Sequence, residues 1–212
     1  MKKLIFFLLI NLILSTQSFA DKIEKFIING NVRISDQTVI LFSKAKPNVH
    51  VYAFEAYKYI CEILQKNVLI NNSKVKVHNC VLSDESKKNL IISESILKEF
   101  NNYGSNFVDL KKKSNQGNLV DSVKIDDLNI QQEVSFMKID VQGYDLKVLR
   151  GAEKTIKRNK MPIIIEYSKE FESKFNYKFS DFLEILKKIN YKIEERISEA
   201  NYLIVYDNNF DK

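Results

Sequence analysis

Short apolar runs alternate along this chain with segments in which apolar residues recur every three or four positions. The apolar runs predict buried strands at residues 26–28, 49–54, 75–81, 136–139 and 161–165. The three- and four-residue spacing predicts helices at residues 35–45, 57–68, 146–156 and 182–189. Residues 191–197 and 202–206 predict a terminal hairpin. Because strands that alternate with helices are typical of a largely parallel sheet with helices on both faces, we expect an α/β fold.

Polar side chains stand directly at the ends of several predicted strands. These residues are Asn29, Glu55, Asp84, Asp140 and Glu166. In a parallel sheet of this kind the ligand lies over the carboxyl ends of the strands. Several carboxylates at one such edge therefore predict a binding or catalytic site.

The composition is that of a globular domain and does not favour a nucleic-acid partner. The chain has 212 residues, 45% hydrophobic and 28% charged, which suits one domain with a sizeable core. The net charge of +6 comes from 33 basic and 27 acidic residues that are interspersed, and residues 111–113 form the one basic run. Such a run is typical of a solvated loop, so we expect no nucleic-acid partner.

Residues 1–20 have the pattern of a secretory signal peptide. A basic start is followed by an apolar stretch at residues 4–14 and by the small residues Ser18 and Ala20. We therefore expect cleavage after Ala20, export or a periplasmic location, and one domain over residues 21–212. As a helix the apolar stretch is about 18 Å long, short of the ~30 Å hydrocarbon core, so no stable membrane span is expected. An uncleaved amphiphilic helix, or a start codon assigned upstream of a cytoplasmic domain, would give the same pattern.

Cysteine and histidine provide no strong candidate for a site. Cys61 and Cys80 have no ligand spacing, so we expect buried core thiols, which would cross-link only if they lay close together in an oxidising compartment. His50 and His78 stand alone on predicted strands without metal-ligand spacing, and we expect no metal site there.

Residues 138–152 resemble the strand-to-helix signature of the FkbM-type S-adenosylmethionine (SAM) methyltransferases. In this stretch Asp140 ends a strand, Gly143 lets the backbone turn closely beneath a ligand, and Asp145 stands in the first helical turn. Other segments are similar to family segments in the same order, at residues 51–55, 81–84, 125–128 and 162–166. The resemblance implies a Rossmann-like class I methyltransferase sandwich, with a mostly parallel sheet and a C-terminal antiparallel hairpin. It also implies a SAM cofactor and O-methylation of a sugar or other small-molecule hydroxyl.

The resemblance further implies roles for three carboxylates. Glu55 would bind the ribose hydroxyls of SAM, and Asp84 would lie near the adenine amino group. Asp140 would be the catalytic residue, which stabilises the sulfonium, orients the acceptor hydroxyl or acts as general base. Plainer interpretations are a solvated carboxylate at a helix start for Glu55 and a helix cap for Asp140.

The first loop departs from the family pattern. The family has an aspartate and two glycines facing the methionine part of SAM, where this chain has Asn29, Asn31 and Ser35. The resemblance still places these three residues in the cofactor site. In the signature, Gln142 replaces a glutamate and removes a charge. The changes leave open a degenerate methyltransferase-fold protein that binds SAM weakly or not at all and acts as a binding module. A nicotinamide-dependent oxidoreductase is more remote, because the chain has no Gly-x-Gly-x-x-Gly motif.

Overall fold

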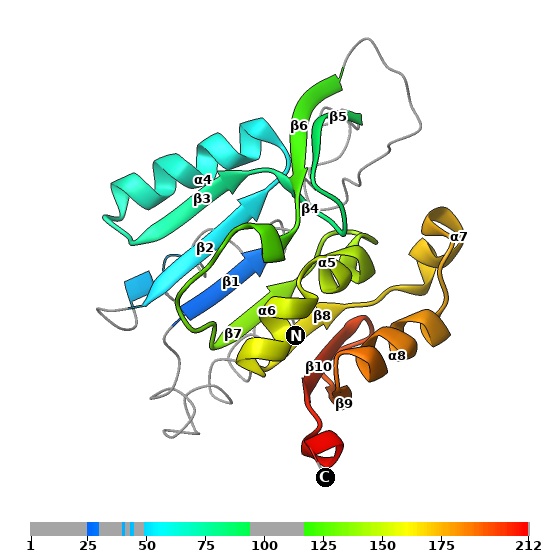
Figure 1. The fold of residues 1–212 in the computed structure, drawn as a ribbon. Helices are drawn as coiled ribbons and strands as arrows, with labels where there is room; N and C mark the ends of the chain where they lie inside the picture. The colour runs from blue at the N-terminus through cyan, green and yellow to red at the C-terminus, as the bar shows by residue number, and fades with distance from the viewer. Residues whose placement is uncertain (1–24, 30–39, 41–42, 45–48, 94–116, 212) are drawn as a thin grey trace.

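A seven-stranded sheet dominates the computed structural model, which describes residues 25–29, 40, 43–44, 49–93 and 117–211. Across the sheet the strands are β3 (Val75–Asn79), β2 (His50–Glu55), β1 (Lys25–Asn29), β7 (Phe136–Ile139), β8 (Ile163–Glu166), β10 (Asn201–Tyr206) and β9 (Tyr191–Arg196) (Figure 1). The strands from β3 to β8 are parallel, whereas β10 is antiparallel to both β8 and β9. The predicted parallel sheet and terminal hairpin are thus confirmed, although the sheet as a whole is mixed.

Helices cover both faces of this sheet. They are α4 (Lys58–Ile70), α5 (Asp145–Gly151), α6 (Glu153–Asn159), α7 (Glu172–Phe175) and α8 (Phe179–Lys188). Leu64 of α4 packs in one apolar cluster with Val51 of β2. Phe54 of the same strand belongs to the larger core, together with Leu149 of α5 and Phe182 of α8. Because residues at odd spacing along a strand point to opposite faces, α4 lies on one face and α5, α6 and α8 lie on the other.

A smaller sheet follows β3 along the chain. Its strands, in order, are β4 (Val81–Leu82), β6 (Gly117–Val123) and β5 (Lys87–Ser93). The prediction of a single strand over residues 75–81 is wrong at its end. Glu55 and Asn79 form the last pair between β2 and β3, so the chain beyond Asn79 has no partner in the main sheet and pairs with β6 instead. Asp84 consequently follows a strand of the smaller sheet and not of the main one.

The helix predicted over residues 146–156 is also divided. Ala152 leaves the helical conformation with φ −115° and ψ 9°, and separates α5 from α6. Asp126 explains the restart, because its carboxylate accepts the backbone N–H of Lys154 at 3.0 Å and that of Thr155 at 2.8 Å. These N–H groups belong to the first turn of α6 and have no partner within the helix. The helix predicted over residues 35–45 lies almost wholly outside the described residues.

Gly151, the last residue of α5, lies against the backbone of Ser83. A Cβ atom on Gly151 would stand 1.9 Å from the carbonyl oxygen of Ser83 and 3.4 Å from the Cα of Asp84. A side chain cannot be accommodated, because a whole element would have to move to make room for it. This contact fixes α5 against the segment that carries Asp84.

Candidate functional site

The strand register brings three carboxylates to one level at the carboxyl edge of the main sheet. Asn29, the last residue of β1, pairs with the residue before Glu55 on β2 and with the residue before Asp140 on β7. On the other side of β7, the residue before Asp140 pairs with the residue before Glu166 on β8. Neighbouring strands lie about 4.8 Å apart, so roughly 10 Å separates the backbones of Glu55 and Asp140, and about 5 Å those of Asp140 and Glu166. This is the edge at which the sequence predicted a site.

Glu55 is held by the turn that joins β2 to α4. Its side chain is only 4% exposed, and Oε1 accepts the backbone N–H of Tyr57 at 2.8 Å. The side-chain amide of Asn79 donates to the carbonyl oxygens of Glu55 and Ala56, at 2.8 and 2.9 Å, and fixes the turn from the neighbouring strand. The interpretation of Glu55 as a solvated carboxylate is therefore wrong, although it does accept an N–H at the start of α4.

Asp140 lies in a buried network of polar side chains. The ammonium of Lys138 lies 3.3 Å from Oδ2 of Asp140, and donates a 2.7 Å hydrogen bond to Oδ1 of Asn201. The amide nitrogen of Gln142 donates to Oδ1 of Asp140 at 3.2 Å and to Oε2 of Glu166 at 3.1 Å. Lys138, Asp140 and Glu166 are all buried. One amide thus joins two carboxylates, which is the physical result of having glutamine where the family has glutamate.

Asp145 holds the turn between β7 and α5. The turn needs positive φ at Gln142 (52°) and Gly143 (93°), a conformation that glycine adopts easily. The two carboxylate oxygens of Asp145 accept the backbone N–H groups of Val141 at 3.1 Å and Gly143 at 3.0 Å. Asp145 is buried, and its burial, together with the negative charge of Asp140, raises its pKa to about 7. Since Asp145 satisfies the backbone of this turn, the contacts of Asp140 do not support its interpretation as a helix cap.

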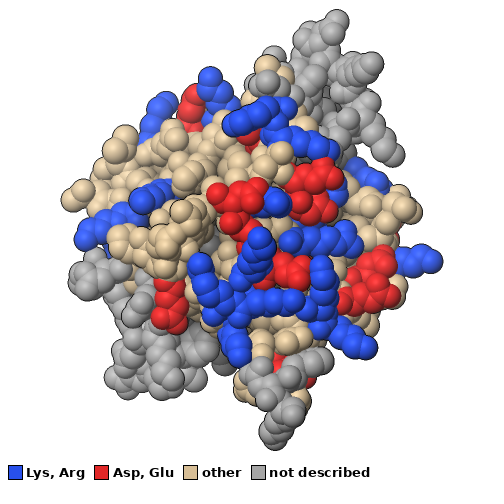
Figure 2. Space-filling view, viewed as in Figure 1, with Lys and Arg blue, Asp and Glu red and all other residues tan. Residues whose placement is uncertain are grey.

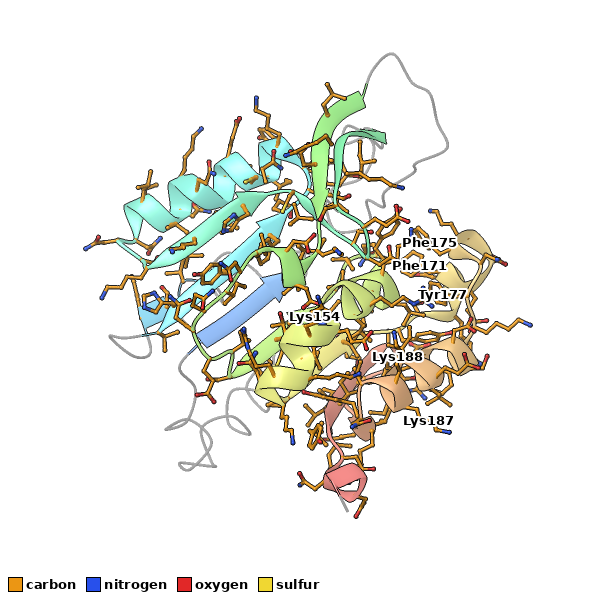
Figure 3. The ribbon with its side chains drawn as sticks, in the orientation of Figure 1. Lys154, Phe171, Phe175, Tyr177, Lys187 and Lys188 are labelled. Carbon is orange, nitrogen blue, oxygen red and sulfur yellow. The ribbon has the colours of Figure 1, made fainter. Side chains whose placement is uncertain are left out.

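Aromatic side chains cover the outer side of this turn. Phe175 packs so closely on Gly143 that a Cβ atom there would come within 2.3 Å of its ring. Phe175 also makes an edge contact with Tyr144 and stacks on Tyr177, with centroids 5.4 and 6.4 Å apart. Figure 3 shows Phe171, Phe175 and Tyr177 gathered around α7. Burial and the nearby carboxylates raise the pKa of Tyr177 above its ordinary value.

Of the remaining predicted site residues, the structure describes Asp84 and Asn29. Asp84 is half-buried and its Oδ1 accepts the hydroxyl of Ser83 at 3.1 Å. Asn29 ends β1, between the strands of Glu55 and Asp140. Asn31 and Ser35 lie outside the described residues.

Histidine and cysteine remain outside the site, as far as the structure describes the chain. The ring of His78 stacks on Phe54 with centroids 5.1 Å apart, and burial lowers its pKa. Its Nε2 has no hydrogen-bond partner among the described residues. Cys61 and Cys80 are buried free thiols, and burial raises their pKa to about 11 and about 12.

Several members of the network had no role assigned from the sequence. Glu166 was placed among the carboxylates of the predicted site edge but was given no role, and Gln142 was noted only as a change from the family signature. Lys138 carries a signal that was missed, since a lysine within a short apolar strand must find a partner when it is buried. Its bond to Asn201 spans 63 residues and has no local signal in the sequence.

The fold and the carboxylates at its edge define a Rossmann-like protein of the class I methyltransferase type. The family model described as methyltransferase FkbM domain matches residues 28–193, and the chain belongs to this family. No curated protein matches the sequence.

The solved structures that are similar to the chain include the following two. Methyltransferase FkbM from Methylobacillus flagellatus KT is 19% identical with a TM-score of 0.55, over 87% of this chain and 44% of that one. The present chain thus spans less than half the length of that relative. A candidate rRNA-methylase from Clostridium thermocellum is 10% identical with a TM-score of 0.50, over 92% of this chain and 93% of that one. At these identities the likeness shows the fold alone. Among the helices that the structure describes, none is both long and apolar enough to cross a membrane.

Proposed function

We propose that this protein transfers a methyl group from SAM to a hydroxyl of a sugar or other small molecule. The observation that carries the proposal is the pair of buried carboxylates, Asp140 and Glu166, joined by Gln142 at the carboxyl edge of the sheet. A hydroxyl donates a hydrogen bond readily to a carboxylate, and fixing its direction aligns the oxygen for displacement. Lys138 offsets the negative charge that two carboxylates concentrate at this place.

The residues at the other end of the edge suit the nucleoside of such a cofactor. Glu55 presents a buried carboxylate, the acceptor that a ribose diol requires, at the end of the second strand. Asp84, which follows β4 of the smaller sheet, offers a hydrogen-bond acceptor for the amino group of the adenine. By resemblance, Asn29, Asn31 and Ser35 complete the cofactor site near the methionine part.

When bound, SAM would supply an electrophilic methyl group and would leave as S-adenosylhomocysteine once the bond between its methyl group and sulfur is broken. The residues of the chain would position the acceptor. Asp140 accepts the hydrogen bond of the acceptor hydroxyl and takes up its proton as the oxygen is alkylated. Gln142 and Lys138 hold the Asp140 carboxylate in place through its two oxygens. Gly143 allows the backbone beneath this group to turn.

Calorimetric titration with SAM tests the proposal. Glu55→Ala should weaken binding by roughly 1–3 kcal/mol, the loss expected for hydrogen bonds to a charged group. Glu62→Ala, an exposed position on α4, is the matched control and should bind like wild type. Equal affinity in wild type and Glu55→Ala would remove the ribose assignment. Absence of binding by wild type at millimolar SAM would leave the degenerate binding module as the better description.

For location, we propose export, with a mature N-terminus at Asp21. The support is the basic start, the apolar residues 4–14 and the pair Ser18 and Ala20. Removal of residues 1–20 would leave β1, which begins at Lys25, intact. N-terminal sequencing of protein from fractionated cells tests this proposal. A cytoplasmic product that retains the leader would contradict it, and would place the protein where SAM is expected.

A further inference from the structure

The outward side of α4 collects exposed apolar side chains. Five of the large apolar side chains that the structure describes are exposed, and three of these five belong to α4. They are Tyr59, 56% exposed, Leu69, 79% exposed, and Ile70, 81% exposed. The inward side of the helix is already used, since Leu64 and Val68 are buried. Exposed apolar side chains that are scattered singly need no explanation, but three on one helix of 13 residues mark a contact surface.

Two charged side chains lie between these apolar groups. Glu62 and Lys66 are both exposed, and neither forms an ion pair or a side-chain hydrogen bond within the described part of the chain. Together with Tyr59 and Leu69 they are separated by steps of three, four and three residues, so all four share one side of the helix. We call these four residues the α4 stripe.

The α4 stripe is complementary to a reversed copy of itself. Its steps are the same in both directions, and reversal exchanges the acidic position with the basic one while both ends stay apolar. A twofold dimer requires this property, because the same patch of each copy must fit the other.

An antiparallel pair of α4 helices, with the twofold axis at the level of Leu64, would bring the matching groups together. Tyr59 of each copy would then lie opposite Leu69 of the other. In the same way Glu62 would lie opposite Lys66, so the stripe would give two apolar contacts and two ion pairs. We propose that two copies of this chain associate through the α4 stripe.

The opposite face of the main sheet does not suit a second copy. The exposed positions of α5, α6 and the end of α8 are largely basic, and Figure 2 shows Lys and Arg gathered over these helices. Two such surfaces repel each other, whereas the α4 stripe has one charge of each sign. A contact between two helices about 20 Å long buries less than the roughly 800 Å² per partner of a standard interface. The dimer should therefore be weak and should depend on protein concentration.

Sedimentation velocity of the full chain tests this proposal. Wild type should form a species of twice the chain mass at about 100 µM and should dissociate at about 1 µM, as a Kd on the order of 10 µM requires. Glu62→Lys and Lys66→Glu should each weaken the dimer by at least about tenfold, because two attractive pairs become two repulsive ones. These two variants change the net charge in opposite directions, so overall repulsion between copies cannot explain a loss in both.

The double variant Glu62→Lys/Lys66→Glu is the sharpest test. It exchanges the two charges, keeps the net charge of wild type, and should restore the dimer to within about threefold of the wild-type Kd. Circular dichroism checks that each variant is folded.

The apolar part of the stripe has its own test. Leu69→Gln combined with Ile70→Gln should weaken the dimer by at least about tenfold. Leu119→Gln combined with Leu183→Gln makes the same kind of change at exposed positions outside α4, and should leave the dimer as in wild type.

Four results would overturn the proposal. A wild type that stays monomeric at about 100 µM would show that the stripe does not bind a second copy. A dimer that withstands both single charge variants would place the association elsewhere on the chain. Failure of the folded double variant to restore the dimer would rule out the antiparallel pairing. A monomeric wild type that binds lipid vesicles, and loses this binding in the Leu69/Ile70 variant, would assign the stripe to a bilayer.

Discussion

The two ends of the carboxyl edge hold their carboxylates in different ways. Glu55 is positioned by a local turn. Its carboxylate accepts the N–H of Tyr57, two residues away, and its carbonyl oxygen accepts a hydrogen bond from the side chain of Asn79 on the next strand. Asp140 is held by side chains, among them Lys138, which is itself bound by Asn201 on β10. The first arrangement is built mostly from backbone, whereas the second exists only once distant strands have assembled. A change of one side chain should therefore damage the Asp140 end far more than the Glu55 end.

Lys138→Met should produce the largest effect. It leaves the buried carboxylate of Asp140 without its cation, and removing one partner of a buried pair costs about 3–5 kcal/mol. Denaturant unfolding of the variant measures this loss directly. Lys58→Met, exposed at the Glu55 end, is the control and should change the free energy of unfolding by less than about 0.5 kcal/mol. Similar losses in both variants would contradict the comparison.

Asp145→Asn should have an intermediate effect that depends on pH. An amide cannot accept both backbone N–H groups, so one is left unpaired at a cost of about 1–3 kcal/mol. In wild type the pKa of Asp145 is raised from 3.8 to about 7, so the folded protein holds a proton that the unfolded chain has lost. The contribution of Asp145 to the free energy of unfolding therefore decreases as pH rises through this window.

Urea unfolding at about pH 5 and about pH 7 separates these two effects of Asp145→Asn. The free energy of unfolding of wild type should decrease from about pH 5 to about pH 7, because the raised pKa of Asp145 no longer favours the folded state there. Asp145→Asn should lack that decrease. Glu194→Gln, an exposed position on β9, should keep the wild-type slope. An unchanged slope in Asp145→Asn would show that other groups cause the dependence.

Asn79→Ala should have the smallest effect. It removes the two hydrogen bonds that hold the Glu55 turn, but the side chain is exposed and water can replace it. We therefore expect the free energy of unfolding to decrease by about 0.5–1.5 kcal/mol. Denaturant unfolding again provides the measurement. A loss as large as that of Lys138→Met would mean that the Glu55 end also depends on a side-chain network.

Much of the fold could be predicted from the sequence, because buried strands and amphipathic helices have distinct periods. The strand ends at Glu55 and Asp140 were predicted for this reason, and the terminal hairpin was too. The predicted bounds of strands and helices were wrong where contacts with distant segments decide where an element ends. Leaving the main sheet after Asn79 depends on where β2 stops, and the restart of α6 depends on Asp126, which lies in another segment.

The candidate site was predictable only in part, for a similar physical reason. A carboxylate at the end of an apolar strand has a local signal, and so has the glycine of a tight turn. The bridge from Gln142 to both Asp140 and Glu166 has none, because it depends on β7 and β8 being neighbours in register. The loop residues Asn31 and Ser35 remain predictions.

The bare contact between Gly151 and Ser83 has a mechanical consequence. Side chains that lie between two elements can change rotamer, and the distance between those elements can then vary. Backbone packed against backbone has no such freedom, so the segment of Asp84 and the end of α5 cannot come closer to each other. The other end of α5 begins at the turn that follows Asp140. Asp84 and Asp140, which are proposed to face one ligand, thus lie at the two ends of the same short helix. A movement of either segment towards the other would be passed on through α5.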